Sequence, residues 1–451
     1  MSRRDLASGP QRARRPLSLL VACALIPAIA HGNGRPPASN GVQFRPGDTA
    51  GLYAATTFGL LVSPDGCRFY WLCEDNIGIG GGFDPAYAVT RSGAILAGTF
   101  HGIRVSRDGG CSFSTVEPGV YFDAIDVSAQ GEICTGSSDT LPDNGVLCST
   151  DDGATFAARG GLPPEMWYRS VMFAPGDASR LYASAYLFGG ADPDGGERSP
   201  TAHLFRSDDD GTHWTEQSLA SVVYGSVPQI YVRAVSPVDA NVVFLQSLAA
   251  QPPMGDRLYR SIDGGTTFAE VLVTTDTIAG VVVHDATTVV VATPSGSFRS
   301  TDSGATFQPL AIQLACLGQR SDGMMFGCTS SFSGDGAALE RSTDGVTWQP
   351  VARLQYLTGT LACPAGTAEF DTCDAQWRGV AVQLGVMPAA CAAGPDAGVG
   401  GPRGDAGASG RRSGCCEAGD SSGALLAALC ALGARIVPRR GSRRRSPAHS
   451  A

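Results

Sequence analysis

Arginine stands beside aromatic residues at three places in the chain, and these groups are the clearest candidates for ligand-binding chemistry. The segments are Trp167-Tyr168-Arg169, Tyr231-Val232-Arg233 and Trp377-Arg378. A guanidinium group presents a planar fork of N–H donors to a carboxylate or sulfate, and an aromatic ring beside it adds a stacking surface. If each segment begins a strand near a common axis, the three predict a cationic pocket for a carboxylate, a sulfate or a sugar acid. The alternative is that the arginines pair with acidic neighbours and the rings only pack.

The sequence shows no pattern for metal, cofactor or nucleophilic chemistry in a suitable structural context. It has no pair of CxxC knuckles and no HExxH, and its six histidines are scattered. No GxSxG, phosphate-binding loop or dinucleotide fingerprint follows a suitable strand. We therefore predict no metal site, no cofactor and no catalytic residue. We expect a protein that is not an enzyme, with a glycosidase as the alternative.

The composition favours short strands joined by turns. The 451 residues include 59 glycines and 28 prolines but only 17% charged residues, which is typical of an all-β chain. All 33 basic residues are arginines, and residues 1–30 and 417–451 each carry a net charge of +4. Without these two ends, the net charge of −9 becomes −17. Phosphate backbones and anionic lipid repel so acidic a body, which excludes nucleic acid as a partner.

Ten of the 14 cysteines lie between Cys67 and Cys391, and their spacing suits disulfides formed in an oxidising compartment. Three pairs each flank a short expected hairpin, and a fourth pair is close in sequence. The predicted pairs are Cys134/Cys148, Cys316/Cys328, Cys363/Cys373 and Cys67/Cys73. Cys111 and Cys391 have no assigned partner.

One turn pattern recurs seven times, at intervals of 39 to 58 residues. Each copy has a serine, an aspartate two residues later, a glycine and a closing Phe or Trp, as in STDSGATF from Ser300. The aspartates are Asp65, Asp108, Asp151, Asp209, Asp263, Asp302 and Asp344. An aspartate accepts hydrogen bonds from amides of its own turn, glycine supplies a positive φ, and the aromatic ring fills apolar space between sheets. This period predicts one propeller blade of four short strands for each copy.

We therefore predict a single, disulfide-stapled all-β propeller over residues 31–387, with seven blades, and with six or eight as alternatives. The last apolar run, from Trp377 to Val386, has no turn after it. We expect it to be a strand that joins the first blade and closes the ring. Surplus loop residues at Leu187–Thr201 and Ala249–Asp256 are further candidates for binding.

The seven turns resemble Asp-box (BNR) repeats, which occur in sialidases, sortilin-type receptors, two-propeller xyloglucanases and photosystem II assembly factors. The resemblance covers roughly residues 41–387. It implies a propeller in which the boxes are structural and lie on the outer rim, away from the binding face. The sialidase signature is only echoed by Phe44-Arg45-Pro46, and no Tyr/Glu pair identifies itself. The resemblance thus implies a fold and no particular activity.

Residues 1–30 are typical of a secretory signal peptide. A basic segment precedes an apolar run from Leu17 to Ala30, and Ala28-Ile29-Ala30 forms a small-x-small site at which we expect signal peptidase to cleave. Two alternatives stay open: a lipobox that ends at Cys23, and a twin-arginine signal near Arg3.

The C-terminal residues resemble a sorting tail. Residues 388–414 form a Pro/Gly/Ala-rich linker, and residues 415–451 contain Cys415-Cys416, an apolar segment and an arginine cluster. This order resembles the MYXO-CTERM tails of Gram-negative surface proteins, which implies cleavage by a sorting protease and display on the outer surface. A weak tail-anchor helix is the alternative. We expect membrane contact only through this tail.

Together these features predict an exported cell-surface propeller that binds a protein, peptide or glycan without catalysis. The first alternative is a sialidase-like glycoside hydrolase, and the second is a structural component of the envelope.

Overall fold

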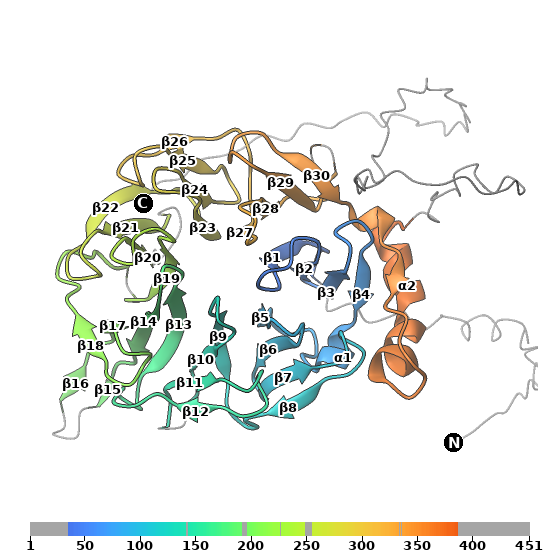
Figure 1. Ribbon diagram of the computed structural model, residues 1–451, viewed down its shortest axis with the longest axis horizontal. Coiled ribbons are helices and arrows are strands. Elements are labelled where there is room, and N and C mark those ends of the chain that lie inside the picture. The colour runs from blue at the N-terminus through green and yellow to red at the C-terminus, as the bar shows by residue number, and fades with distance from the viewer. Residues whose placement is uncertain are drawn as a thin grey trace, which may run out of the picture. The chain divides into compact units, whose positions relative to one another are not determined.

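The computed structural model describes residues 35–140, 143–191, 196–225, 227–248, 255–332, 334 and 336–386. Seven antiparallel blades stand around a ring, and the four strands of each blade follow one another outward from the axis (Figure 1). The predicted fold, an all-β propeller of seven blades, is confirmed. The expected signal peptide, linker and sorting tail, with Cys391, Cys415 and Cys416, lie outside the described residues.

The blades have the following strands, given from the inner to the outer edge. Blade 1 contains β1 (Ser39–Gln43), β2 (Leu52–Thr56), β3 (Gly59–Ser63) and β4 (Tyr70–Leu72), followed by the short helix α1 (Glu74–Ile77). Blade 2 contains β5 (Ala86–Val89), β6 (Ile95–Thr99), β7 (Gly102–Ser106) and β8 (Ser114–Val116). Blade 3 contains β9 (Phe122–Val127), β10 (Ile133–Ser137), β11 (Val146–Ser149) and β12 (Ala157–Ala158). Blade 4 contains β13 (Trp167–Ala174), β14 (Asp177–Leu187), β17 (Thr201–Ser207) and β18 (Thr215–Gln217).

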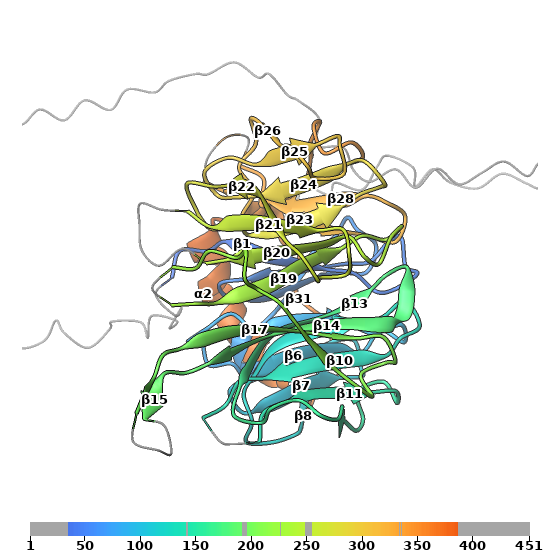
Figure 2. The same cartoon turned by 90° about the vertical axis from the view of Figure 1, so that its left-hand side faces the viewer.

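The remaining blades repeat this order. Blade 5 contains β19 (Ile230–Val235), β20 (Val243–Ser247), β21 (Arg257–Ser261) and β22 (Ala269–Val273). Blade 6 contains β23 (Gly280–Val283), β24 (Val289–Ala292), β25 (Phe298–Ser300) and β26 (Gln308–Pro309). Blade 7 contains β27 (Cys316–Gln319), β28 (Met325–Cys328), β29 (Leu339–Ser342) and β30 (Gln349–Ala352). A small hairpin of β15 (Gly190–Ala191) and β16 (Glu197–Arg198) projects from blade 4 (Figure 2).

The ring has two different faces because neighbouring strands in every blade are antiparallel. The connection between the third and fourth strands always lies on one face, together with the connection between the first and second strands. This face carries the seven Ser-x-Asp turns, and we call it the turn face. The connections between the second and third strands, and those that lead from one blade to the next, lie on the opposite face, which we call the loop face.

Apolar residues pack between successive blades, so that each junction has its own cluster. The closing aromatic of each turn lies in the cluster between its own blade and the preceding one; for example, Phe268 of blade 5 packs with Tyr182 and Leu204 of blade 4. The seven residues are Phe69, Phe113, Phe156, Trp214, Phe268, Phe307 and Trp348. A residue fixed by a local turn therefore also joins two sheets.

The turns are held by their own side chains, as the turn of blade 6 shows. Ser300 Oγ accepts a hydrogen bond from Gly304 N at 2.8 Å and donates one to Asp302 at 2.6 Å. Asp302 also accepts hydrogen bonds from the amide and hydroxyl of Thr306 at 2.9 and 2.6 Å. Gly304 has a φ of +81°, and a Cβ there would lie 2.4 Å from Phe244 of blade 5, so only glycine fits. All seven turn aspartates accept such backbone hydrogen bonds.

After blade 7 the chain returns to the outer edge of blade 1 and forms a segment, residues 353–386, that we call the clasp. It contains η1 (Leu354–Tyr356), β31 (Gly359–Thr360), the π-helical turn η2 (Glu369–Cys373) and α2 (Asp374–Leu384). β31 pairs in parallel with β4, and α2 lies outside the ring (Figure 1). The four blade strands of blades 1 and 7 are each consecutive in sequence, and β31 adds a fifth strand from the C-terminal segment to the outer edge of blade 1. Within the described ranges, no helix combines the length and apolar character that crossing a membrane requires.

The predicted closing strand from Trp377 to Val386 is wrong, because these residues form most of α2 and its C-cap. Trp377, Val380 and Leu384 have helical spacing and contact the apolar cluster between blades 7 and 1. The Trp377 ring lies 5.8 Å from that of Trp71 in β4. The valines suggested a strand, but the buried positions repeat every three to four residues.

Two predicted disulfides are confirmed. Cys134–Cys148 joins directly paired residues of β10 and β11 in blade 3. Cys316–Cys328 joins β27 and β28 in blade 7 in the same way. In both cases the two cysteines are close in sequence because they lie on the two strands of one hairpin.

The predicted pairs Cys363/Cys373 and Cys67/Cys73 are wrong. Cys73 bonds to Cys373 and Cys111 bonds to Cys363, across 300 and 252 residues. Both bonds attach the clasp to the start of the propeller, to the segment after blade 1 and to the turn of blade 2. Local spacing cannot reveal them, because the fold brings their partners together from opposite ends of the propeller. Multiple disulfides indicate an oxidising, extracytoplasmic location.

Candidate functional site

The inner strands of blades 3, 4 and 5 bring a charged and aromatic group together at the loop face. Arg169 of β13 lies between Asp123 of β9 and Tyr231 of β19. Its Nη1 is 2.6 Å from Asp123 Oδ2, and its Nη2 donates to the Tyr231 hydroxyl at 2.9 Å. The Tyr121 hydroxyl donates to the other oxygen of Asp123 at 2.8 Å. Arg169 thus connects three successive blades.

Arg233 lies two residues after Tyr231 on the same strand. Its guanidinium carbon is 4.8 Å from the centre of the Tyr231 ring. Its Nε donates to Gln246, which in turn donates to Asp256. Within the described residues, neither Nη of Arg233 has a hydrogen-bond or ion-pair partner, and neither is a fully buried unpaired atom. Both Nη groups are therefore available to a ligand.

The charges of the two arginines are compensated to different extents. Burial by itself lowers the pKa of Arg169, but Asp123 and Tyr231 raise it above its usual value overall. Burial also lowers the pKa of Arg233, and there Tyr231 and Asp256 only partly offset the effect. A desolvated cation without a directly paired carboxylate is stabilised when an anion approaches. Arg233 is therefore the candidate binding residue, and Arg169 is a positioning residue for Tyr231.

The structure separates the two aromatic residues that precede Arg169. Tyr168 is fully buried in the cluster between blades 3 and 4, and its hydroxyl donates to the Pro163 carbonyl at 2.7 Å. Trp167 is half-buried and packs edge-on against Phe188 at 4.2 Å. Tyr168 therefore serves the core, and Trp167 lies with the loop-face aromatics.

Trp377 and Arg378 do not join this group. Both lie on α2, outside the ring, and Arg378 is exposed to solvent. The expected triad of arginines is therefore a pair, Arg169 and Arg233. Arg45, in the segment that echoes the sialidase signature, lies after β1 on the turn face and is also separate from the pair.

Sequence reasoning missed the acidic partner of the pair. Tyr121-Phe122-Asp123 opens β9 just as Trp167-Tyr168-Arg169 opens β13, with two aromatic residues before a charged one. The pattern of arginine beside aromatic residues does not include the aspartate at the equivalent position of β9. The repeat of two aromatic residues before a charged one in successive blades was the available signal.

Exposed aromatic rings gather on the loop face. Phe100, Phe188 and Phe332 lie in connections between second and third strands and are 51%, 41% and 65% exposed. Phe100 stacks on Tyr121 with ring centroids 4.3 Å apart and contacts Phe83 at 4.2 Å. Among the described residues of the seven blades, these are the exposed large aromatic side chains. Such rings are typical of binding surfaces, where they bury much area at little conformational cost.

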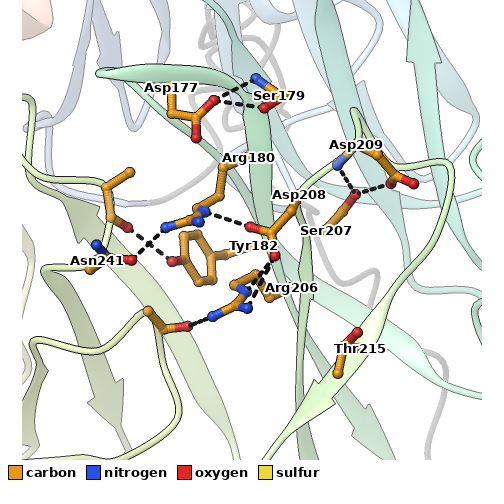
Figure 3. A network of polar contacts seen from close by, with 12 residues as sticks. Asp177, Ser179, Arg180, Tyr182, Arg206, Ser207, Asp208, Asp209, Thr215 and Asn241 are labelled. Carbon is orange, nitrogen blue, oxygen red and sulfur yellow. Dashed lines mark hydrogen bonds and ion pairs between the residues drawn. The ribbon is translucent and has the colours of Figure 1, made fainter.

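On the turn face, two arginines of blade 4 form a network that joins blade 4 to blade 5 (Figure 3). Arg180 and Arg206 of blade 4 both contact Asp208, at 2.6 and 3.0 Å. Arg180 also donates to Asn241 Oδ1 at 2.7 Å, and Arg206 donates to the Gly264 carbonyl at 3.0 Å. Both acceptors belong to blade 5. This network joins two blades, and each of its two arginines contacts a carboxylate directly.

Catalytic and metal chemistry find little support among the described residues. Asp123 is held by Arg169 and Tyr121, so it is not placed as a free acid or nucleophile. Two groups combine a carboxylate with two cysteines close enough for a metal ion. In both groups the cysteines form disulfides, so no thiolate is available as a ligand.

No family model matches the chain, and no curated protein matches it. Solved structures of similar fold include the GH74 enzyme of Niastella koreensis, at 16% identity and a TM-score of 0.38 over 72% of this chain and 66% of that one. They include YCF48 of Cyanidioschyzon merolae, at 13% identity and a TM-score of 0.32 over 52% of this chain and 73% of that one. They also include PorZ, a surface component of the type-IX secretion system of Porphyromonas gingivalis. PorZ is 16% identical, with a TM-score of 0.44 over 64% of this chain and 45% of that one. The chain thus spans about two thirds of the Niastella enzyme and less than half of PorZ, and the likeness concerns the fold alone.

Proposed function

We propose that this protein is an exported, noncatalytic propeller that binds an anionic group of a protein, peptide or glycan at its loop face. The observation that carries the proposal is the pair of free Nη groups on Arg233, beside Tyr231 and without a carboxylate of their own. A bidentate pair with a carboxylate, sulfate or phosphate would compensate this charge. Arg169 and Asp123 would hold Tyr231 in place.

The neighbouring aromatic rings support a ligand larger than a single ion. Phe100, Tyr121 and Phe83 form one contiguous aromatic group, and Trp167, Tyr186 and Phe188 form another. Sugar rings and peptide side chains stack on such surfaces. The anion would fix the orientation of the ligand, and the rings would supply the contact area.

A binding role without turnover agrees with the state of the carboxylates near Arg233. Asp123 is paired with Arg169, and Asp256 accepts hydrogen bonds from the Ile278 amide and the Thr277 hydroxyl at 2.9 Å each. Glycoside hydrolysis commonly needs two carboxylic groups that flank the scissile bond. Neither carboxylate is free for that work.

The proposed location follows from the disulfides together with the expected N-terminal signal and C-terminal sorting tail. In this proposal the signal directs export, and the tail leads to display on the outer surface of a Gram-negative bacterium. Cell fractionation and surface labelling of the producing organism would test this part separately from ligand binding.

The binding experiment is an array of acidic and neutral glycans and peptides, probed with purified protein and followed by an assay for released product. We expect binding to anionic members, no product, and loss of binding in Arg233→Gln. Arg299→Gln is the control, because Arg299 lies on the turn face, where its Nε donates to the Asp344 carbonyl. Equal binding by Arg233→Gln and the wild type would refute the site, and release of a sugar would establish the glycosidase alternative.

A further inference from the structure

A cavity lies on the turn face, away from the site of Arg233. Its volume is about 660 Å³, and blades 1, 2 and 3 and the clasp all contribute to its walls. Arg45 and Tyr53 come from blade 1, and Arg107 comes from the turn of blade 2. Leu361 and Ala362 of the clasp line another side, next to the disulfide Cys111–Cys363.

The donors in this cavity are largely unused. Arg45 donates through Nε to the Arg91 carbonyl at 2.8 Å, and within the described residues its Nη groups have no hydrogen-bond or ion-pair partner. Arg107 makes one long contact, 3.4 Å from Nη2 to the Asp152 carbonyl. The Tyr53 hydroxyl likewise has no hydrogen-bond partner among the described residues and is not a fully buried unpaired atom. Two guanidinium groups and a phenol therefore face one cavity with N–H and O–H groups to spare.

The two carboxylates in the walls already accept hydrogen bonds from their neighbours. Asp108 accepts hydrogen bonds from the hydroxyls of Ser106 and Ser112 at 2.7 and 2.5 Å. Asp152 accepts one from Ser92 Oγ at 2.6 Å. A bound cation would have to compete with these bonds, whereas a bound anion would meet unused donors.

Apolar side chains complete the cavity. Val62, Ala94 and Leu361 line it, and Leu361 also packs on the apolar cluster between blades 1 and 2. A ligand that fits must combine an anionic group for the arginines with an apolar part for these side chains.

We propose that this cavity is a second binding site, for a small carboxylate or sulfate that carries an apolar group, and that the clasp supplies one of its walls. The site is independent of the loop-face site. Because Leu361 and Ala362 directly precede Cys363, the disulfide to Cys111 sets the shape of the cavity. Binding here therefore depends on the oxidised clasp.

The probe is 4-fluorobenzoate, whose fluorine line width reports weak binding, with neutral 4-fluorobenzamide as the matched control compound. The full chain carrying Arg233→Gln is the background, so that the loop-face site does not contribute. We expect saturable broadening by the benzoate and little by the amide. Arg45→Gln should weaken binding about tenfold or more, and Arg107→Gln should weaken it less, because Arg107 is the more exposed.

Two further variants test the wall formed by the clasp. Ala362→Trp places a bulky side chain at the exposed cavity wall and should abolish binding while the melting temperature stays unchanged. Arg299→Gln, on the turn face of blade 6, should bind like the background protein. Two results would overturn the second site. The first is absence of saturable binding in the Arg233→Gln background, and the second is binding by Arg45→Gln and Ala362→Trp that equals binding by the background protein. Either result would leave the loop-face proposal untouched.

Discussion

The junction between blades 4 and 5 has arginines at both ends, and the arginines at the two ends have different kinds of partner. On the turn face, Arg180 and Arg206 share the carboxylate of Asp208 and reach acceptors in blade 5 (Figure 3). On the loop face, Arg169 pairs with Asp123, and Arg169 and Arg233 share Tyr231. Each end has two arginines and one paired carboxylate. On the turn face both arginines contact that carboxylate and hold two sheets together, whereas on the loop face Arg233 contacts none among the described residues, and this is the physical difference between a structural network and a binding site.

The largest expected effect is a loss of ligand affinity when Arg233, at the loop-face end, is substituted. Arg233→Gln should weaken binding of an anionic ligand by about tenfold to a hundredfold, because a charge-assisted hydrogen bond is lost. Its unfolding free energy should fall by only about 1 kcal/mol, since the variant loses the hydrogen bond to buried Gln246 but leaves no paired carboxylate behind. Ligand titration and urea denaturation of the same preparation measure both quantities. A large loss of stability with unchanged affinity would make the loop-face end structural as well.

The next effect concerns the turn of blade 5 at the turn-face end. Ser261 is buried and accepts a hydrogen bond from Gly265 N at 2.8 Å, so Ser261→Ala leaves that amide unsatisfied. We expect a loss of about 2 kcal/mol in unfolding free energy and unchanged ligand affinity. Ser218→Ala, at an exposed position after blade 4, is the control and should be near neutral. Weaker ligand binding in Ser261→Ala would show that the two faces are coupled.

A smaller effect is expected at the shared carboxylate. Asp208→Asn removes the charge that serves Arg180 and Arg206, but Asp208 is itself 48% exposed. Solvent screening therefore limits the expected loss to about 1 kcal/mol. Asp285→Asn, in the equivalent turn of blade 6, is the matched control, because Asp285 accepts hydrogen bonds from Thr287 and Thr288 of its own turn. If both variants unfold alike in urea, the network does not act as a unit.

The smallest effect is a dependence on acid pH that belongs to the turn face. Hydrogen bonds from the side chain and amide of His213 hold the pKa of Asp209 at about 2, below its usual value. Since the folded pKa is depressed, the stabilisation is complete above pH 4 and is lost as the pH falls toward 2. Urea denaturation of the wild type and Asp209→Asn should therefore differ at pH 5 and converge near pH 2. A difference that persists at pH 2 would assign the effect to packing and not to charge.

The fold could be predicted because its repeated signal is local. Ser300, Asp302, Gly304 and the closing aromatic act within one turn, and their spacing alone determines the hydrogen bonds that form. The aromatic then joins its sheet to the preceding one, so seven turns imply seven packed blades. Because the hydrogen bonds of each turn and the packing of its aromatic residue favour the same arrangement, the fold can be predicted from the turn pattern.

The clasp and half of the site could not be predicted, for two different reasons. Cys73 and Cys111 find partners 300 and 252 residues away, and only the closed ring brings those residues together. Arg378 stands beside an aromatic residue, as Arg169 and Arg233 do, so the local sequence does not distinguish the three. Their positions in the fold decide which arginines come together. Arg169 and Arg233 lie near the start of neighbouring inner strands, whereas Arg378 lies on an outer helix.

The clasp also determines how the molecule bears a mechanical load. A pull on the chain beyond Val386 enters through α2, and the bond Cys73–Cys373 passes it to the segment after blade 1. Cys111–Cys363 carries a second share to blade 2. The pairing of β31 with β4 involves only Gly359 and Thr360 and would unzip under force on its own. With both covalent links in place, tension is carried by sulfur–sulfur bonds, and the blades need not peel away one strand at a time.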